Sequence, residues 1–196
     1  LYILSLECVV LGRFATDNAK NFQAITCVPK KNLVAACSVE DGTIWVFDWT
    51  EKKLKGKLRA HTPEKDIGCF KYDLKKGLLY SCGGDGKILV WKIEEMLTHG
   101  KPYREFYLDG NFIAAILLNC VKEGDFVTLC NNDDGTNLVF WNIESEKPKG
   151  LKKVFDSSAY NMICYHNKKQ LLVKSSKSAD LIVLEEPPAS RSWWLW

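Results

Sequence analysis

Short apolar runs bounded by turn-forming residues recur along the whole chain. Examples are Leu33–Cys37, Leu78–Cys82 and Ile88–Trp91, which are rich in branched and aromatic side chains and lie close to Asp-Gly pairs. Runs of this length with such boundaries predict β-strands rather than helices. Helical periodicity is confined to Ile93–Leu97, where we expect one helical turn between two strands. The pattern therefore predicts an all-β fold.

A larger unit repeats along the chain: an apolar strand, a turn, a second apolar strand, an Asp-Gly turn and a third strand ending in an aromatic residue. The turn glycines Gly42, Gly86 and Gly135 are 44 and 49 residues apart. A fourth, weaker copy has the pair Ala179-Asp180 in place of the Asp-Gly turn. Repeats of about 40 to 50 residues built from short strands predict four-stranded antiparallel units arranged radially.

The second copy resembles the WD-repeat β-propeller family most clearly. In that family a His before the first strand, a Ser or Thr on the second, an Asp in the turn and a Trp on the third form a hydrogen-bonded tetrad. The resemblance assigns these roles to His61, Ser81, Asp85 and Trp91.

The other copies depart from this pattern. The resemblance places Cys37 and Cys130 at the hydroxyl position of the first and third copies, with Phe47 and Trp141 as their aromatic residues. The fourth copy keeps only Asp180.

We expect a partial propeller with about four and a half four-stranded blades. Because open blade faces invite association, further blades of the same chain or another chain would complete the ring. The lack of an initiator Met favours a piece of a longer protein. The expected parts are 1–19 (third and fourth strands of a preceding blade), 20–61, 62–108 and 109–156 (one blade each), and 157–196 (a degenerate blade and a Trp-rich tail).

Composition narrows the class of protein. The chain is 46% hydrophobic and 26% charged with a formal net charge of +3, which excludes a disordered tail and disfavours a dedicated nucleic-acid binder. No apolar run has the length of a membrane-spanning helix. The eight cysteines are widely spaced without a C-x-x-C motif, so we expect reduced thiols, no metal site and no cofactor. This favours an intracellular protein, cytoplasmic first and nuclear as the alternative.

Two nucleophile arrangements deserve comparison with the structural interpretation. A catalytic triad would need an exposed Ser beside an oxyanion hole, whereas a tetrad explains His61, Ser81 and Asp85 without a substrate. Cys164 and His166 share one side of a strand but have no orienting third group. We therefore expect no catalytic residue.

Three segments are candidates for binding a partner. The first is the predicted outer strand, in which Lys53, Lys55, Lys57 and Arg59 would share one side; this charge either protects a sheet edge or meets a phosphate-rich partner. The second is an acidic, amide-rich loop, and the third is the Trp-rich tail. The residues in these two segments are Asn131, Asn132 and Asp133, and Trp193, Trp194 and Trp196.

The resemblance implies a non-catalytic scaffold or adaptor that presents loops to other proteins in a multiprotein complex. Two alternatives remain open. The chain could be the accessory propeller of a larger enzyme, or a propeller that binds phosphate groups, RNA or lipid through the basic outer strand.

Overall fold

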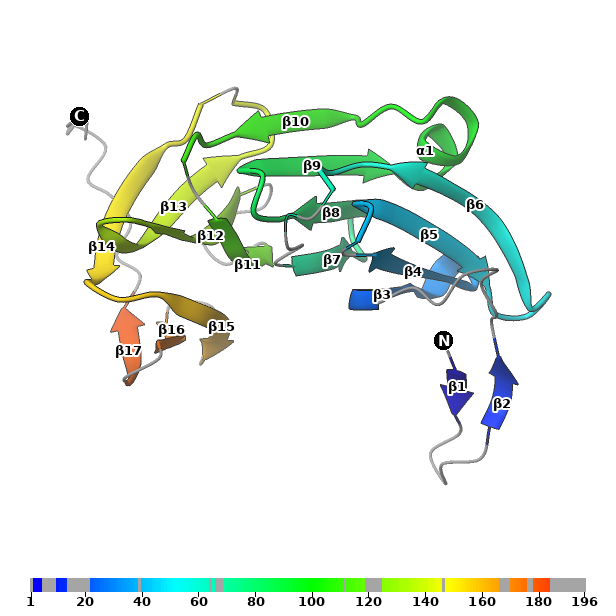
Figure 1. Cartoon of the computed structure of the whole chain (residues 1–196), viewed down its shortest axis with the longest axis horizontal. Coiled ribbons are helices and arrows are strands. Elements are labelled where there is room, and N and C mark those ends of the chain that lie inside the picture. The colour runs from blue at the N-terminus through cyan, green and yellow to red at the C-terminus, as the bar shows by residue number, and fades with distance from the viewer. Residues whose placement is uncertain are drawn as a thin grey trace. The chain divides into compact units, whose positions relative to one another are not determined.

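The computed structural model describes residues 2–4, 10–13, 22–38, 40–63, 65, 69–110, 112–118, 125–145, 147–165, 170–175 and 178–183. Within these ranges the chain is built of β-strands, with one short 3-10 helix and one α-helix (Figure 1). Consecutive strands pair with one another, so each sheet is formed from a continuous stretch of sequence.

Five sheets follow each other along the described chain. The first contains two strands, the next three contain four strands each, and the last contains three. Their strands are β1 (Tyr2–Leu4) and β2 (Val10–Arg13); β3 (Phe22–Val28), β4 (Leu33–Ser38), β5 (Thr43–Asp48) and β6 (Lys53–Arg59); β7 (Cys69–Asp73), β8 (Leu78–Cys82), β9 (Lys87–Lys92) and β10 (Arg104–Tyr107); β11 (Phe112–Leu118), β12 (Asp125–Asn132), β13 (Gly135–Asn142) and β14 (Gly150–Phe155); β15 (Ala159–Tyr165), β16 (Gln170–Ser175) and β17 (Ala179–Val183).

This succession confirms the all-β prediction of repeated four-stranded sheets. The fourth copy of the repeat differs in one respect. Asp180 is not a turn residue, because it lies within β17 and pairs with Val173 of β16. Ser175 N instead donates to Ser178 O at 2.8 Å, which closes the hairpin before the predicted Ala179-Asp180 pair.

The chain forms two compact units, which are described separately. Unit 1 comprises Leu1–Ser81 with Leu89–Glu105, and unit 2 comprises Cys82–Ile88 with Phe106–Trp196. Each has its own apolar core. The core of unit 1 includes Val28, Leu33, Ala35, Cys37, Ile44, Val46, Phe70, Leu79, Leu89, Trp91, Ile93 and Met96, and that of unit 2 includes Ala114, Ala115, Val127, Leu129, Leu138, Ala159, Met162, Leu171 and Val173.

In unit 1 the middle strands β4 and β5 are buried on both faces. On β4, Ala35 and Cys37 belong to the main core, whereas Ala36 packs with Trp45 and Phe47 on the other face. The rings of Trp45 and Phe47 stack with centroids 6.3 Å apart, and Phe22 meets both edge-on. Strands covered on both faces read as continuous apolar runs, which explains the pattern seen in the sequence.

The helical turn expected at Ile93–Leu97 is confirmed as α1 (Ile93–His99), between β9 and β10. It buries Ile93 and Met96 and ends at Gly100, whose left-handed backbone donates to Met96 O. The η1 helix (Pro29–Lys31) connects β3 to β4. No helix in the described part of the chain is long and apolar enough to cross a membrane.

The cysteines do not all follow the expectation of reduced thiols. Cys69 and Cys82 are disulfide-bonded, so the expectation is wrong for these two. Cys27, Cys37 and Cys130 are free, with Cys37 and Cys130 buried.

The turn between the second and third strands of each four-stranded sheet lies against the segment that leaves its fourth strand. Gly42 has a φ of +64°, and its carbonyl accepts hydrogen bonds from Ala60 N and His61 N, both at 3.0 Å. A Cβ at Gly42 would lie 2.2 Å from His61 O. A Cβ at Gly86 would lie 2.5 Å from Leu108 O, and a Cβ at Gly135 would lie 2.2 Å from Phe155 O. Glycine is therefore required by close backbone approach as well as by backbone conformation.

We expect Gly42→Ala to destabilise the protein by about 2–5 kcal/mol, because it adds both positive-φ strain and a clash with backbone. Gly110→Ala is the matched control. Gly110 also has a positive φ, +67°, but nothing lies within 4 Å of its Cβ position, so its cost should be about 1 kcal/mol. Urea denaturation of both variants measures the difference. Equal costs would show that the close approach contributes nothing.

Candidate functional site

The end of each sheet that carries these glycine turns is called the turn face. It combines the turn between the second and third strands with the segment that leaves the fourth strand. In unit 2 the backbone of Leu108 donates to Gly86 O at 2.9 Å, and Ile113 N donates to Gly83 O at 3.2 Å. These bonds hold neighbouring loops to one another, so the face is a set of paired loops on a rigid base.

Three of the four predicted tetrad residues are joined by hydrogen bonds in unit 1. His61 Nε2 lies 2.9 Å from Ser81 Oγ, and Trp91 Nε1 donates to the same oxygen at 3.0 Å. All three side chains are buried. Asp85 lies in the β8–β9 turn, where its carboxylate accepts a hydrogen bond from Lys87 N at 3.1 Å. Ser81 is fully buried, and its hydroxyl anchors an indole and an imidazole, which does not fit an exposed nucleophile.

The third blade has a corresponding bond at a different position from the one predicted. Trp141 Nε1 donates to Thr128 Oγ1 at 2.8 Å, so Thr128 and not Cys130 supplies the hydroxyl. Trp141 pairs across the sheet with Phe126, and Thr128 is the next residue of β12 on that face. The turn and Trp141 are separated by one more residue than in the second blade, which shifts the reachable hydroxyl along the strand.

Cys130 is fully buried, and its Sγ lies 3.2 Å from Thr128 Oγ1. Burial raises the pKa of the Cys130 thiol to about 12, although the hydrogen bond with Thr128 lowers it slightly. The thiol therefore stays protonated at neutral pH and is not an activated nucleophile.

In the first blade the hydroxyl prediction for Cys37 is also wrong. Phe47 pairs with Val34 on β4, and the next residue on that face is Ala36, whereas Cys37 faces the main core. An apolar pair thus replaces the Trp–hydroxyl pair of the other two blades. On the same sheet, Trp45 Nε1 and Ser38 Oγ are buried and have no hydrogen-bond partner among the residues that the structure describes.

Asn131 has a structural task that the sequence did not reveal. Its Oδ1 accepts hydrogen bonds from Ala159 N at 3.0 Å and Thr136 Oγ1 at 2.6 Å, and its Nδ2 donates to Ala159 O at 2.8 Å. Thr136 Oγ1 is also 2.6 Å from Ser157 O. Because its side chain is buried and saturated by these bonds, Asn131 is not a surface for a partner, contrary to the prediction.

The neighbouring loop residues remain on the surface. Asp133 is exposed, and Asn132 is partly exposed with its side-chain oxygen accepting a hydrogen bond from Asp134 N at 3.1 Å. Trp193, Trp194 and Trp196 lie outside the described residues, as does His166. Within the described residues, no group of three or more His, Cys, Asp or Glu side chains could hold a metal ion.

The predicted basic stripe is interrupted by a β-bulge. Trp45 pairs with Lys57, whereas beyond the irregularity Phe47 pairs with Leu54, which leaves Lys55 as the extra residue. Residues directly opposite one another share a face, so Lys57 lies on the Trp45 face together with Leu54. The sequence analysis had placed Leu54 on the face opposite to the cations.

The four cations consequently have separate environments. Lys53 pairs with Asp48 and Arg59 with Thr43, which puts these two cations on opposite faces of the sheet. Lys55 Nζ lies 2.9 Å from Glu51 and 3.6 Å from Asp48, and Lys57 Nζ lies 5.1 Å above the Trp45 ring. The expectation that all four share one side is wrong.

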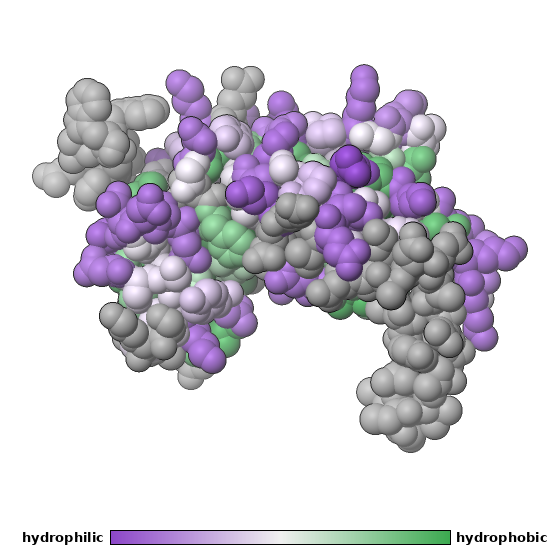
Figure 2. All heavy atoms as spheres, viewed as in Figure 1, coloured by the Kyte–Doolittle hydropathy of each residue, from purple (hydrophilic) through white to green (hydrophobic). Residues whose placement is uncertain are grey.

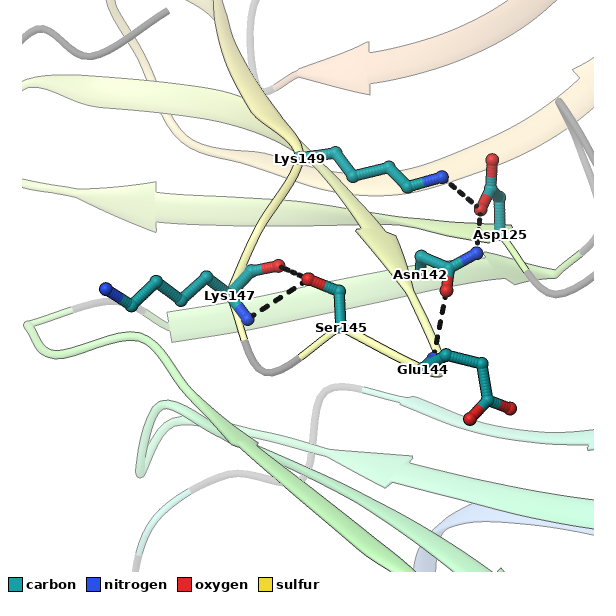
Figure 3. Close-up of polar contacts among 6 residues, drawn as sticks. All are labelled: Asp125, Asn142, Glu144, Ser145, Lys147 and Lys149. Carbon is teal, nitrogen blue, oxygen red and sulfur yellow. Dashed lines mark hydrogen bonds and ion pairs between the residues drawn. The ribbon is translucent and has the colours of Figure 1, made fainter. Parts of the chain in front are cut away.

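A polar network that the sequence did not indicate organises the β13–β14 turn in unit 2 (Figure 3). The buried carboxylate of Asp125 accepts hydrogen bonds from Asn142 Nδ2 at 2.6 Å and Lys149 Nζ at 2.8 Å. Asn142 Oδ1 in turn accepts one from Glu144 N at 2.9 Å. Its role is to order the turn, because the Asp125 carboxylate is buried beneath Lys149.

A double-mutant cycle tests the Trp–hydroxyl bond of the third blade. We expect Thr128→Val to cost about 1–3 kcal/mol, because it leaves the Trp141 indole N–H buried without an acceptor. In the Thr128→Val variant, Trp141→Phe should cost less stability than it does in the unmodified protein, because the first blade already tolerates an apolar pair. The free energy of unfolding measures the coupling, and strict additivity of the two changes would contradict the assignment.

Comparison with known proteins agrees with this geometry. Residues 52–92 match the family model described as WD domain, G-beta repeat. The match runs from β6 through β9, so a sequence repeat joins the outer strand of one sheet to three strands of the next. No curated protein sequence matches the chain.

Several solved structures share the fold at low sequence identity. The crystal structure of the computationally designed Ika4 protein aligns with a TM-score of 0.65 and 15% identity over 88% of this chain and 97% of that one. The designed Ika8 protein aligns with a TM-score of 0.66 and 16% identity over 89% of this chain and 49% of that one. The β-propeller domain of Myceliophteria thermophila Cps50 (Swd1) aligns with a TM-score of 0.66 and 19% identity over 86% of this chain and 54% of that one. The chain therefore spans about half the length of the Ika8 and Cps50 structures. Residues 52–92 thus match a WD repeat, and the chain shares the β-propeller fold of these structures.

Proposed function

We propose that this chain is a non-catalytic scaffold or adaptor that binds another protein through its turn face. WD-repeat propellers are in general interaction platforms rather than catalysts. Their rigid sheets position variable loops, so binding energy comes from a few side chains on those loops.

The observation that carries the proposal is the chemistry of the turn face in unit 2. Tyr107 is 57% exposed, and its hydroxyl donates to Asp109 Oδ1 at 2.9 Å, which holds the ring in one orientation. Asp133 and Asp134 are exposed on the β12–β13 turn of the same unit. The carboxylate of Asp156 is also exposed and lies 2.8 Å from Lys153 Nζ. A face that carries an exposed, oriented aromatic ring and several exposed carboxylates suits a partner segment that carries Lys or Arg.

The alternatives from the sequence receive less support. The basic outer strand does not present a continuous stripe, because the bulge at Lys55 splits it. Ser81 of the possible triad is fully buried and hydrogen-bonded to His61 and Trp91, which does not suit an exposed nucleophile. A role as the accessory propeller of a larger enzyme stays compatible with the scaffold function, since such a propeller also acts by binding.

Affinity purification of the full-length protein from its own cells, followed by native mass spectrometry, tests the proposal. We expect discrete complexes with reproducible partner masses. The double variant Tyr107→Ala, Asp133→Lys should lose at least one partner by about tenfold or more, as expected for removal of an aromatic anchor and a charge.

Glu144→Lys is the control, because Glu144 is an exposed acid at the opposite end of the strands in the same unit. It should retain all partners. A single unaccompanied chain would contradict the scaffold function, and equal losses in both variants would contradict the assignment to the turn face.

A further inference from the structure

The strand ends opposite the turn face in unit 1 are called the base patch. Three turns lie at this end: η1 after β3, the β5–β6 turn and the β7–β8 turn. Because β3 and β7 lie side by side and run in the same direction, the turns that follow them lie at the same end (Figure 1). Trp49 N donates to Asn32 O at 3.0 Å, which ties the β5–β6 turn to the end of η1.

Exposed lysines without ion-pair partners gather on this patch. Lys30 belongs to η1, Lys52 and Lys53 to the β5–β6 turn and the start of β6, and Lys75 to the β7–β8 turn; all four are exposed. Hydrophilic side chains project at the β5–β6 turn in Figure 2. Within the described ranges, none of the four forms an ion pair, whereas Lys31 pairs with Glu94. These four charges are therefore available to a ligand.

Two carboxylates of the base patch point inward, whereas Glu51 in the β5–β6 turn is exposed and pairs with Lys55 at 2.9 Å. Asp48 Oδ1 accepts hydrogen bonds from Thr50 N and Glu51 N, each at 2.9 Å, and Asp48 is buried. The hydrogen bond from Glu51 N is the main reason why the pKa of Asp48 lies below its usual value. Asp73, also buried, accepts from Lys75 N at 2.9 Å. Asp48 and Asp73 thus order the turns from below, and the four lysines face solvent.

Two exposed apolar side chains lie on the same turns as the lysines. Trp49 is 41% exposed and Leu74 is 50% exposed, and each lies in a turn rather than in a groove. Lys52 has a φ of +55°, a conformation that costs a residue with a Cβ about 1 kcal/mol and that glycine or asparagine would adopt more easily. A lysine is present there despite this strain.

The corresponding turn in unit 2 is built differently. At the β13–β14 turn, Lys149 is bonded to the buried Asp125 (Figure 3). This turn of unit 2 therefore holds Lys149 in an ion pair, although Lys147 in the same turn is exposed.

We propose that the base patch binds the surface of an anionic phospholipid bilayer peripherally. Lysines above inward-facing carboxylates complement lipid phosphates and serine headgroups, and each is worth about 1 kcal/mol near such a surface. Trp49 fits the membrane–water interface, and Leu74 fits the acyl boundary beneath it.

Other polyanions match the patch less well. Leu74 cannot stack on a base, and the patch lacks the arginines that recognise nucleic-acid phosphates in bidentate fashion. In unit 1 the patch lies at the opposite strand ends from Gly42, so a bound membrane leaves the turn face of that unit free.

Co-sedimentation of the full-length protein with vesicles tests the proposal. We expect binding to phosphatidylcholine vesicles containing about 30 mol% phosphatidylserine, weakening with added salt, and no binding to phosphatidylcholine alone. The patch variant Lys30→Glu, Lys52→Glu, Lys75→Glu should bind more than about 100-fold more weakly. The variant Trp49→Ser, Leu74→Ser should bind about tenfold more weakly with an unchanged salt dependence.

The control variant Lys101→Glu, Lys147→Glu, Lys152→Glu reverses three other exposed lysines and has the same formal net charge as the patch variant. It should bind as the unmodified protein does. Circular dichroism verifies that each variant is folded. The proposal is overturned by absence of binding to phosphatidylserine vesicles, by equal loss in the patch and control variants, or by binding to polyglutamate in preference to vesicles.

Discussion

The close approach between a turn glycine and the segment leaving the fourth strand is the constraint on which the rest of the structure depends. At Gly42 the connecting backbone approaches so near that only a hydrogen atom fits in the position of a side chain. The contact recurs at Gly86 and Gly135. Each time it fixes where the chain leaves one sheet, and thereby where the next sheet begins.

The polar contacts that reinforce this arrangement differ among the blades. In the second blade a loop histidine reaches inward to Ser81, whereas in the third a strand asparagine, Asn131, reaches outward to the backbone of Ala159. Either solution satisfies buried donors and acceptors while holding a loop to a sheet. In the first blade, Ala36 and Phe47 take the place of both members of the hydrogen-bonded pair. Replacing both costs less stability than removing one, because no donor or acceptor of the pair is left buried and unpaired.

The two described surfaces follow from the same division of labour. Loops at the turn face are held by backbone and buried side chains, so exposed residues such as Tyr107 and Asp133 are free to meet a partner. At the base of unit 1, buried Asp48 and Asp73 order the turns and the lysines remain uncommitted. At these two surfaces, buried polar groups order the backbone and exposed charges lie above them.

The sequence by itself determined the strands, the repeat, the glycine turns and the short helix at Ile93, because these depend on local periodicity and backbone conformation. Only the tertiary structure decided which side chains meet. The extra residue before Trp141 moved its hydroxyl partner from Cys130 to Thr128, and the bulge at Lys55 placed neighbouring cations on opposite faces. The sequence predicted that Asn131 lies in a loop, whereas the structure places it in β12, bonded to the backbone of Ala159 in the following blade. A change of one residue in strand register moves a side chain to the other face of the sheet. A single sequence does not show where a bulge or a longer turn causes such a change.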